Sequence, residues 1–205
     1  MPGDDSGESD EHEDRAGETA AEKGAERDSG GDGTENDKVP TNDGQRFDRL
    51  PATDAERRDP ERPTRREVLE WWDERFGVDP SVFADHTFWE RGRGKVWAFA
   101  GSAETPVETE GLGMTFLRTR REHWKPTLEA VQRFGDHATR NVVALSRAEA
   151  ATFVAGRDQS LPWDGDWGFL VVTHELAGEE EPLGVGLYVH GELRSQVPTG
   201  RRREF

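Results

Sequence analysis

The chain has 205 residues, of which 43 are acidic and 27 are basic, and its formal net charge is −16. No apolar run approaches the ~18 residues that a membrane-spanning helix needs, and no apolar signal segment opens the sequence, so we expect a cytoplasmic protein. The lack of cysteine excludes disulfides, thiolate zinc sites and cysteine nucleophiles. Only 4 of the basic residues are Lys and 23 are Arg, and this scarcity of lysine in an acidic chain favours a halophilic protein.

Residues 1–60 are predicted to be a disordered acidic tail and lead-in. They hold 19 acidic and 8 basic residues, and only 10 of the 60 are apolar. So polar a segment cannot bury enough apolar surface to offset the entropy that it loses on ordering. Phe47 and Leu50 begin an extended lead-in that we expect to dock weakly. We interpret the tail as a solubilising extension, and the alternative is an interaction arm or a nucleic-acid mimic.

Residues 61–205 hold 55 apolar residues, which is enough for one domain with one core. A capping box from Thr64 to Glu67 predicts a helix that ends at Gly77. Runs at 87–91 and 95–100 predict a β-hairpin, and 111–118 predicts a further strand.

Two more helices are predicted further along the chain. Pro126, at a first helical position, predicts a helix that ends at Gly135. A strand at 141–145 then leads to a second capping box at Ser146, whose helix ends near Gly156.

The last part of the chain is predicted to be β structure. Its strands are 168–174, 183–190 and 193–197; an acidic loop at 175–182 joins the first two, and a tight turn at Gly191 joins the last two. About seven strands and three helices without regular alternation favour the α+β class, with a small mixed β-sheet or a partly closed barrel, over a doubly wound sheet.

No set of residues in the sequence supports a catalytic function. The glycine pairs at 111–113 and 184–186 do not run into a helix, as a phosphate-binding loop requires. His174 and His190 end consecutive strands, where they could meet at one edge, but hydrogen-bonded surface histidines explain them better than a metal site. Asp164 and Asp166 lack the remaining ligands of a calcium loop. We predict a protein that is not an enzyme and needs no metal or cofactor.

Basic residues gather in three places within the otherwise acidic chain. The clusters are Arg91, Arg93 and Lys95; Arg118, Arg120, Arg121 and Lys125; and Arg194 with Arg201, Arg202 and Arg203. Trp89, Trp97, Trp124, Trp163 and Trp167 lie near them in sequence. Arginine suits bidentate contact with phosphate, and tryptophan offers a face on which bases stack. The alternative is that Arg caps strand ends while Trp fills the core.

The segment from Leu183 to Pro198, LGVGLYVHGELRSQVP, followed by TGRRR, resembles a known family. It is similar to the end of the PUA-like RNA-binding domain in RsmF-type members of the Sun family of RNA cytosine-5 methyltransferases. Segments at 124–127, 142–146 and 168–172 are also similar, so the resemblance covers roughly residues 66–203. The chain departs from the family because it lacks the methyltransferase core and has Leu187 where a basic residue is expected.

The resemblance implies that residues 61–205 are a PUA-like RNA-binding domain without catalytic activity. It implies RNA contacts at Arg194 and at Arg201, Arg202 and Arg203, and from the basic cluster we expect a second contact at Arg118, Arg120, Arg121 and Lys125. The predicted function is an accessory role on ribosomal or transfer RNA, in modification or ribosome assembly, beside a separately encoded methyltransferase and away from membranes. The alternatives are an adaptor that docks such a methyltransferase without touching RNA, and a small-molecule-binding barrel.

Overall fold

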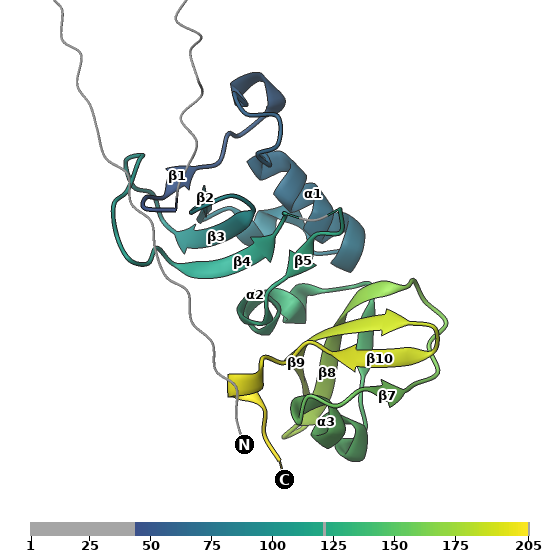
Figure 1. Cartoon of the computed structure of the whole chain (residues 1–205). Helices are drawn as coiled ribbons and strands as arrows, with labels where there is room; N and C mark the ends of the chain where they lie inside the picture. The colour runs from purple at the N-terminus through teal and green to yellow at the C-terminus, as the bar shows by residue number, and fades with distance from the viewer. Residues whose placement is uncertain (1–43, 121, 205) are drawn as a thin grey trace, which may run out of the picture. The chain divides into compact units, whose positions relative to one another are not determined.

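The computed structural model describes residues 44–120 and 122–204, so most of the predicted tail lies outside the described residues. The described chain forms three α-helices and two five-stranded β-sheets (Figure 1). The α+β class is therefore confirmed. Both sheets are open rather than closed into a barrel.

The first sheet is antiparallel, in the order β1-β2-β3-β4-β5. Its strands are β1 (Asp48–Arg49), β2 (His86–Glu90), β3 (Lys95–Ala100), β4 (Met114–Arg118) and β5 (Lys125–Pro126). The hairpin of β2 and β3 confirms the prediction from sequence. The short strands β1 and β5 were not predicted, because two residues carry no periodicity.

Helix α1 (Arg65–Phe76) begins and ends as its local sequence predicts. The Thr64 hydroxyl accepts from the amide of Glu67 at 3.1 Å, and the Glu67 carboxylate accepts from the amide of Thr64 at 2.8 Å. Gly77 ends the helix with a φ of 65°, which glycine adopts at little cost. The buried face of α1 carries Trp72, which stacks on Phe116 of β4 with ring centroids 4.8 Å apart.

The second sheet is mixed, in the order β6-β8-β9-β10-β7, with β6 parallel to β8. Its strands are β6 (Val142–Ala144), β7 (Gln159–Ser160), β8 (Gly168–Leu176), β9 (Glu179–Val189) and β10 (Glu192–Ser195). The acidic segment 175–182 is not a loop, as the sequence indicated. Most of it continues the ladder of β8 and β9, and the chain turns only at Ala177 and Gly178.

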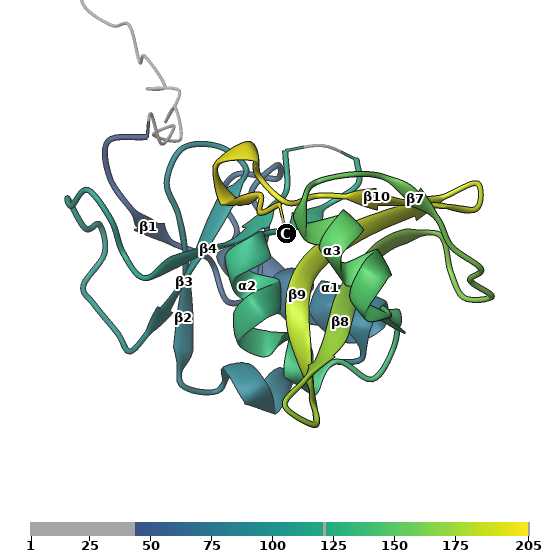
Figure 2. The same ribbon diagram turned by 90° about the horizontal axis from the view of Figure 1, so that it is seen from below.

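Helix α2 (Leu128–Phe134) packs against β4 and β9, between the two sheets (Figure 2). The predicted start of this helix at Pro126 is wrong. Pro126 pairs with Leu117 in β5, and Thr127 instead caps the helix by accepting from the amide of Ala130 at 3.2 Å. Helix α3 (Arg147–Val154) begins with the predicted capping box at Ser146.

One apolar core joins the two sheets. Val171 of β8 and Val185 of β9 belong to the same buried cluster as Trp72, Phe83 and Phe116. The opposite face of the second sheet packs a separate core beneath α3, which includes Phe153, Leu170 and Leu193. The second sheet therefore packs against the first sheet with one face and against α3 with the other.

The lead-in before α1 packs against the first sheet. Phe47 is fully buried, Leu50 is 5% exposed, and β1 pairs with β2. Arg62 donates to the carbonyl oxygens of Asp48 at 2.7 Å and Arg49 at 2.9 Å, and it pairs with Glu90 at 2.9 Å.

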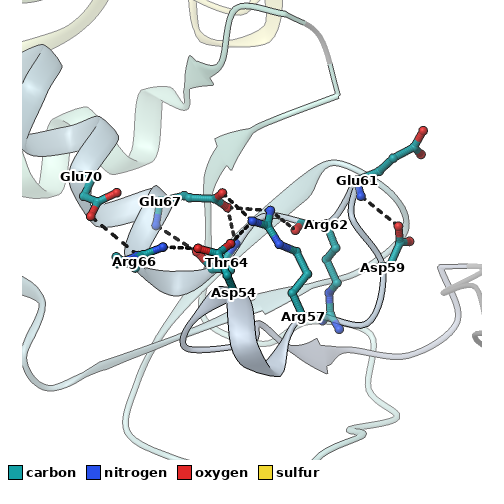
Figure 3. Close-up of polar contacts among 9 residues, drawn as sticks. All are labelled: Asp54, Arg57, Asp59, Glu61, Arg62, Thr64, Arg66, Glu67 and Glu70. Atoms are coloured by element: carbon teal, nitrogen blue, oxygen red, sulfur yellow. Dashed lines mark hydrogen bonds and ion pairs between the residues drawn. The ribbon is translucent and has the colours of Figure 1, made fainter.

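The lead-in is also tied to the start of α1 by ion pairs, which Figure 3 shows. Arg57 pairs with Asp54 and with Glu67, whose carboxylate completes the capping box of α1. Arg66, on the first turn of that helix, pairs with Asp54 as well. The domain boundary at residue 60 stays a prediction that truncation can test.

Candidate nucleic-acid interface

Three basic residues stand directly across from one another on neighbouring strands of the first sheet. Lys95 of β3 is opposite Arg118 of β4, and Arg118 is opposite Lys125 of β5. Directly opposed residues on antiparallel strands share a face, with Cβ atoms about 4.5–5.5 Å apart. Like charges in these positions destabilise a sheet. We call Lys95, Arg118 and Lys125 the cation row, and its arrangement indicates a site for an anionic ligand.

The cation row lines a cleft of about 620 Å³ between the two sheets. Arg93, Arg120 and His123 line the same cleft, and Val185, Gln196 and Pro198 contribute its wall from the second sheet and the segment after it. Glu129 is the one carboxylate among the described residues that line the cleft. The cleft is therefore a strongly basic surface on a chain whose net charge is −16.

Several cations in the cleft lack acidic partners. Arg93 is neutralised by Asp59 and Glu61. Lys125 donates to the Gln196 side-chain oxygen at 2.5 Å, which ties the cation row to the second sheet. Over residues 44–120 and 122–204, Lys95, Arg118 and Arg120 form no ion pair. Their charges can therefore be met by a ligand.

The turn between β2 and β3 brings the first basic cluster beside Arg120. Gly94 has a φ of 75°, and a Cβ atom there would lie 2.6 Å from the Cβ of Arg120, so a larger residue cannot occupy this turn without a shift. The amide of Gly94 donates to the buried carboxylate of Glu90 at 2.7 Å. Burial raises the pKa of Glu90, although this hydrogen bond and Arg62 favour its charged form.

The structure brings together some of the predicted RNA-contacting residues. Arg118, Arg120 and Lys125 line the cleft, whereas Arg121 lies outside the described residues. Arg201 is at the rim, where its guanidinium pairs with Glu129 at 3.0 Å.

Arg194 lies on the side of β10 that faces the first sheet. Its neighbour Leu193 is buried beneath α3, and successive residues of a strand point to opposite faces. Gln196, two residues further on, shares the face of Arg194 and lines the cleft. Arg194 itself pairs with Glu192 at 2.7 Å, so its charge is partly compensated.

Arg202 and Arg203 lie apart from the cleft, at the end of α3. The Arg202 side chain lies over Gly156 and donates to the carbonyl oxygen of Val197 at 3.4 Å. The backbone amide of Arg203 donates to the carbonyl oxygen of Val154 at 3.0 Å. The run of three arginines is therefore divided between two places.

The sequence did not single out Lys95 as a partner of Arg118. The two belong to different basic clusters, and only the register of β3 and β4, which includes a β-bulge at Val96 and Trp97, places them opposite each other. Most of the tryptophans near the clusters are buried or half-buried, which agrees with the alternative in which Trp fills the core. Trp89 is fully buried, for example, whereas Trp167 is 60% exposed.

The structure also separates the two histidines that the sequence placed near one edge. His174 contacts the carbonyl oxygen of Leu145 at 2.8 Å, and His190 packs against Trp167 at the opposite end of the β8–β9 ladder. The described residues contain no group of three or more His, Asp or Glu that could hold a metal ion. None of their helices is long and apolar enough to cross a membrane.

Two family models match separate segments of the chain. Residues 140–203, which hold β6 to β10 and α3, match the family described as the methyltransferase RsmF PUA domain. This segment is similar to the RsmF-type PUA domain that the resemblance named, and the extent of the domain over residues 61–205 stays a prediction. Residues 34–113 match a family of unknown function, DUF7122. Lys95 lies in the second of these matches, and Arg118 and Lys125 lie between the two.

The chain is also similar to a curated protein, the ribosomal RNA small subunit methyltransferase F of Aeromonas salmonicida (strain A449). The two are 26% identical over 107 residues, which is 51% of this chain and 22% of that protein. The match therefore spans about a fifth of the length of the relative.

Proposed function

We propose that this protein binds RNA in the cleft between its sheets and acts as an accessory factor without catalysis of its own. Ribosomal RNA is the first substrate to consider, because the similar protein is named for the ribosomal RNA of the small subunit, and transfer RNA is the second. The role would be in RNA modification or ribosome assembly. The observation that carries the proposal is the opposition of Lys95 and Arg118 in the cation row, two like charges that form no ion pair among the described residues.

The cleft supplies the kinds of contact that RNA backbones accept. Lys95 and Lys125 act as point charges toward phosphate, whereas Arg118 between them can contact one phosphate through two N–H groups. Adjacent strands are about 4.8 Å apart, so the row spans about 10 Å across three strands. The Gln196 amide and Arg194 extend the polar surface onto the PUA-like domain.

The adaptor alternative predicts an exposed apolar patch in place of a basic surface. Among the described residues, the large exposed apolar side chains are Trp167 and Leu176, and these flank opposite ends of β8. Two separate side chains do not form a docking patch. The distribution of charge thus favours RNA over a protein partner, and a separately encoded methyltransferase stays an additional proposal.

The test measures the binding of the full chain to labelled fragments of small-subunit ribosomal RNA and to transfer RNA, by fluorescence anisotropy at fixed salt. We expect binding to at least one of these RNAs, weakened in Arg118→Ala and unchanged in Arg133→Ala. Arg133 is an exposed arginine on α2 that does not line the cleft. Equal loss in both variants, or no binding by the unaltered chain, would contradict the proposal.

A further inference from the structure

Trp167 stands out from the other tryptophans of this chain. All seven lie among the described residues, and Trp167 is the one whose side chain is mostly exposed, at 60%. An indole is a large apolar surface, and its exposure costs free energy that burial would recover. Single exposed apolar side chains are common in folded proteins, so a role for Trp167 has to rest on its surroundings.

The loop before β8 holds Trp167 at the surface. Trp163 packs against Tyr188 with ring centroids 6.4 Å apart, and its indole N–H donates to the carbonyl oxygen of Asp166 at 3.2 Å. Gly165 lies so close to the ring of Trp163 that a Cβ atom there would be 2.5 Å from it. The loop is thus folded tightly around Trp163, and this leaves Trp167 outside.

Trp167 makes one aromatic contact, with His190. The ring centroids are 4.6 Å apart and the planes meet at 68°, which is an edge-to-face arrangement. His190 sits in the two-residue turn between β9 and β10, where both it and Gly191 have positive φ. The contact fixes the indole against the turn without enclosing it.

Trp167 lies along the second sheet from the cleft. Val185 of β9 lines the cleft, and His190 follows that strand five residues later, about 16 Å away at about 3.3 Å per residue. Arg194 is paired with Leu187, between these two points. Along β9, Arg194 therefore lies between the cleft and the turn that Trp167 contacts.

We infer that Trp167 is a stacking site for an unpaired nucleobase of the RNA that binds in the cleft. The inference rests on the proposed function and adds the class of substrate: RNA with a single-stranded nucleotide beside the bound backbone. Asp164 and Asp166 both precede the indole in the chain, and Asp166 interacts with Arg75. The indole itself indicates the ligand, because an uncharged aromatic face suits a base rather than a phosphate. Stacking on an aromatic side chain is the usual way in which proteins hold unpaired bases of RNA.

The test compares variants of the full chain that change only the ring. Trp167→Leu keeps an apolar side chain but removes the stacking face, and Trp167→Phe keeps a smaller face. Leu176→Ala is the matched control, because Leu176 is the other exposed large apolar side chain, at the opposite end of β8. For RNA with an unpaired nucleotide, we expect Trp167→Leu to weaken binding roughly tenfold, Trp167→Phe to retain most of the affinity, and the control to have no effect.

A second RNA identifies the contact. The same sequence with an abasic site at the unpaired position should bind the unaltered chain and Trp167→Leu equally, because the base that stacks is missing. If Trp167→Leu loses as much affinity on the abasic RNA, or none on either RNA, the stacking site is wrong. Loss of binding in Arg118→Ala beside normal binding in Trp167→Leu would leave the proposed function intact and overturn this inference alone.

Discussion

In the first sheet, Lys95 and Arg118 stand across from each other with no described acidic partner, whereas in the second sheet Arg194 is paired with Glu192. Arg201, which follows that sheet, is likewise paired, with Glu129. A basic cluster in a sequence gives the number of charges but not their partners. The comparison therefore places the stronger part of the proposed RNA interface in the first sheet, outside the segment that matches the RsmF PUA domain.

The largest expected effect is on stability, and it tests whether the lead-in at Phe47 helps to hold the first sheet together. Phe47→Ala should lower the free energy of unfolding by about 3–5 kcal/mol, because it leaves a cavity at a fully buried ring. Thermal or denaturant unfolding measures the loss. Trp167→Leu, which removes an exposed ring, is the control. A change below about 1 kcal/mol for Phe47→Ala would show that the lead-in is only loosely attached, as the sequence indicated.

The next prediction tests whether the cation row contributes more to RNA binding than the arginines at 201–203 do. Replacing all three residues of the cation row by Ala should weaken RNA binding roughly a hundredfold near 0.1 M salt and lower the salt slope by about 3, since each residue neutralises one phosphate. The melting temperature should stay constant or rise slightly, because like charges are removed from opposed positions. Binding curves at several salt concentrations measure both quantities. Unchanged affinity would exclude the cation row as the RNA site.

A smaller effect is expected at the C-terminal arginines. Replacing Arg201, Arg202 and Arg203 by Ala should weaken RNA binding only severalfold, because Arg201 must first leave Glu129 and the other two lie at the end of α3. The same binding assay, run beside the cation-row variant, measures the ratio. A loss larger than that of the cation-row variant would reverse the comparison between the sheets.

The smallest effect concerns the pH dependence of stability at Glu90, which packs beside the turn that carries Arg93 and Lys95. Burial raises the pKa of this carboxyl above its ordinary value of 4.5, so the folded state holds the proton more tightly than the unfolded state does. Its contribution to stability is therefore fully present below pH 4.5 and is lost as the pH rises through the higher folded value.

Comparison with Glu90→Gln isolates this contribution. Between about pH 4 and pH 7, the unaltered chain should lose stability relative to Glu90→Gln, in urea unfolding at each pH. Asp79→Asn is a control of opposite sign, because hydrogen bonds from Ser81 lower the pKa of Asp79. Parallel pH profiles for the unaltered chain and Glu90→Gln would show that the pKa of Glu90 is not raised.

Local signals predicted local structure well. The capping boxes at Thr64 and Ser146 each need only four residues, and both helices begin where the sequence indicated. Two short strands, β1 and β5, and the continuation of β8 and β9 through the acidic segment depend on pairing with distant partners. No local pattern specifies such pairings, so the division into two sheets was not foreseen.

The candidate site shows the same limit. Arg118, Arg120 and Lys125 were predicted as RNA contacts because they are clustered in sequence, and they do line one cleft. The opposition of Lys95 and Arg118 depends on strand register and on a β-bulge, and the exposure of Trp167 depends on how a loop folds around Trp163. Residue type indicated the chemistry, but only the fold shows which charges are left without partners.

The most direct measurement is ultraviolet crosslinking of the full chain to bound ribosomal RNA, followed by mass spectrometry of the peptides that carry nucleotides. We predict crosslinked peptides from residues 93–95, 115–120 and 123–125, which contribute side chains to the cleft, and from the loop that holds Trp167. Crosslinks confined to residues 199–204, or to surfaces away from both places, would contradict the assignment of the RNA interface to the cation row.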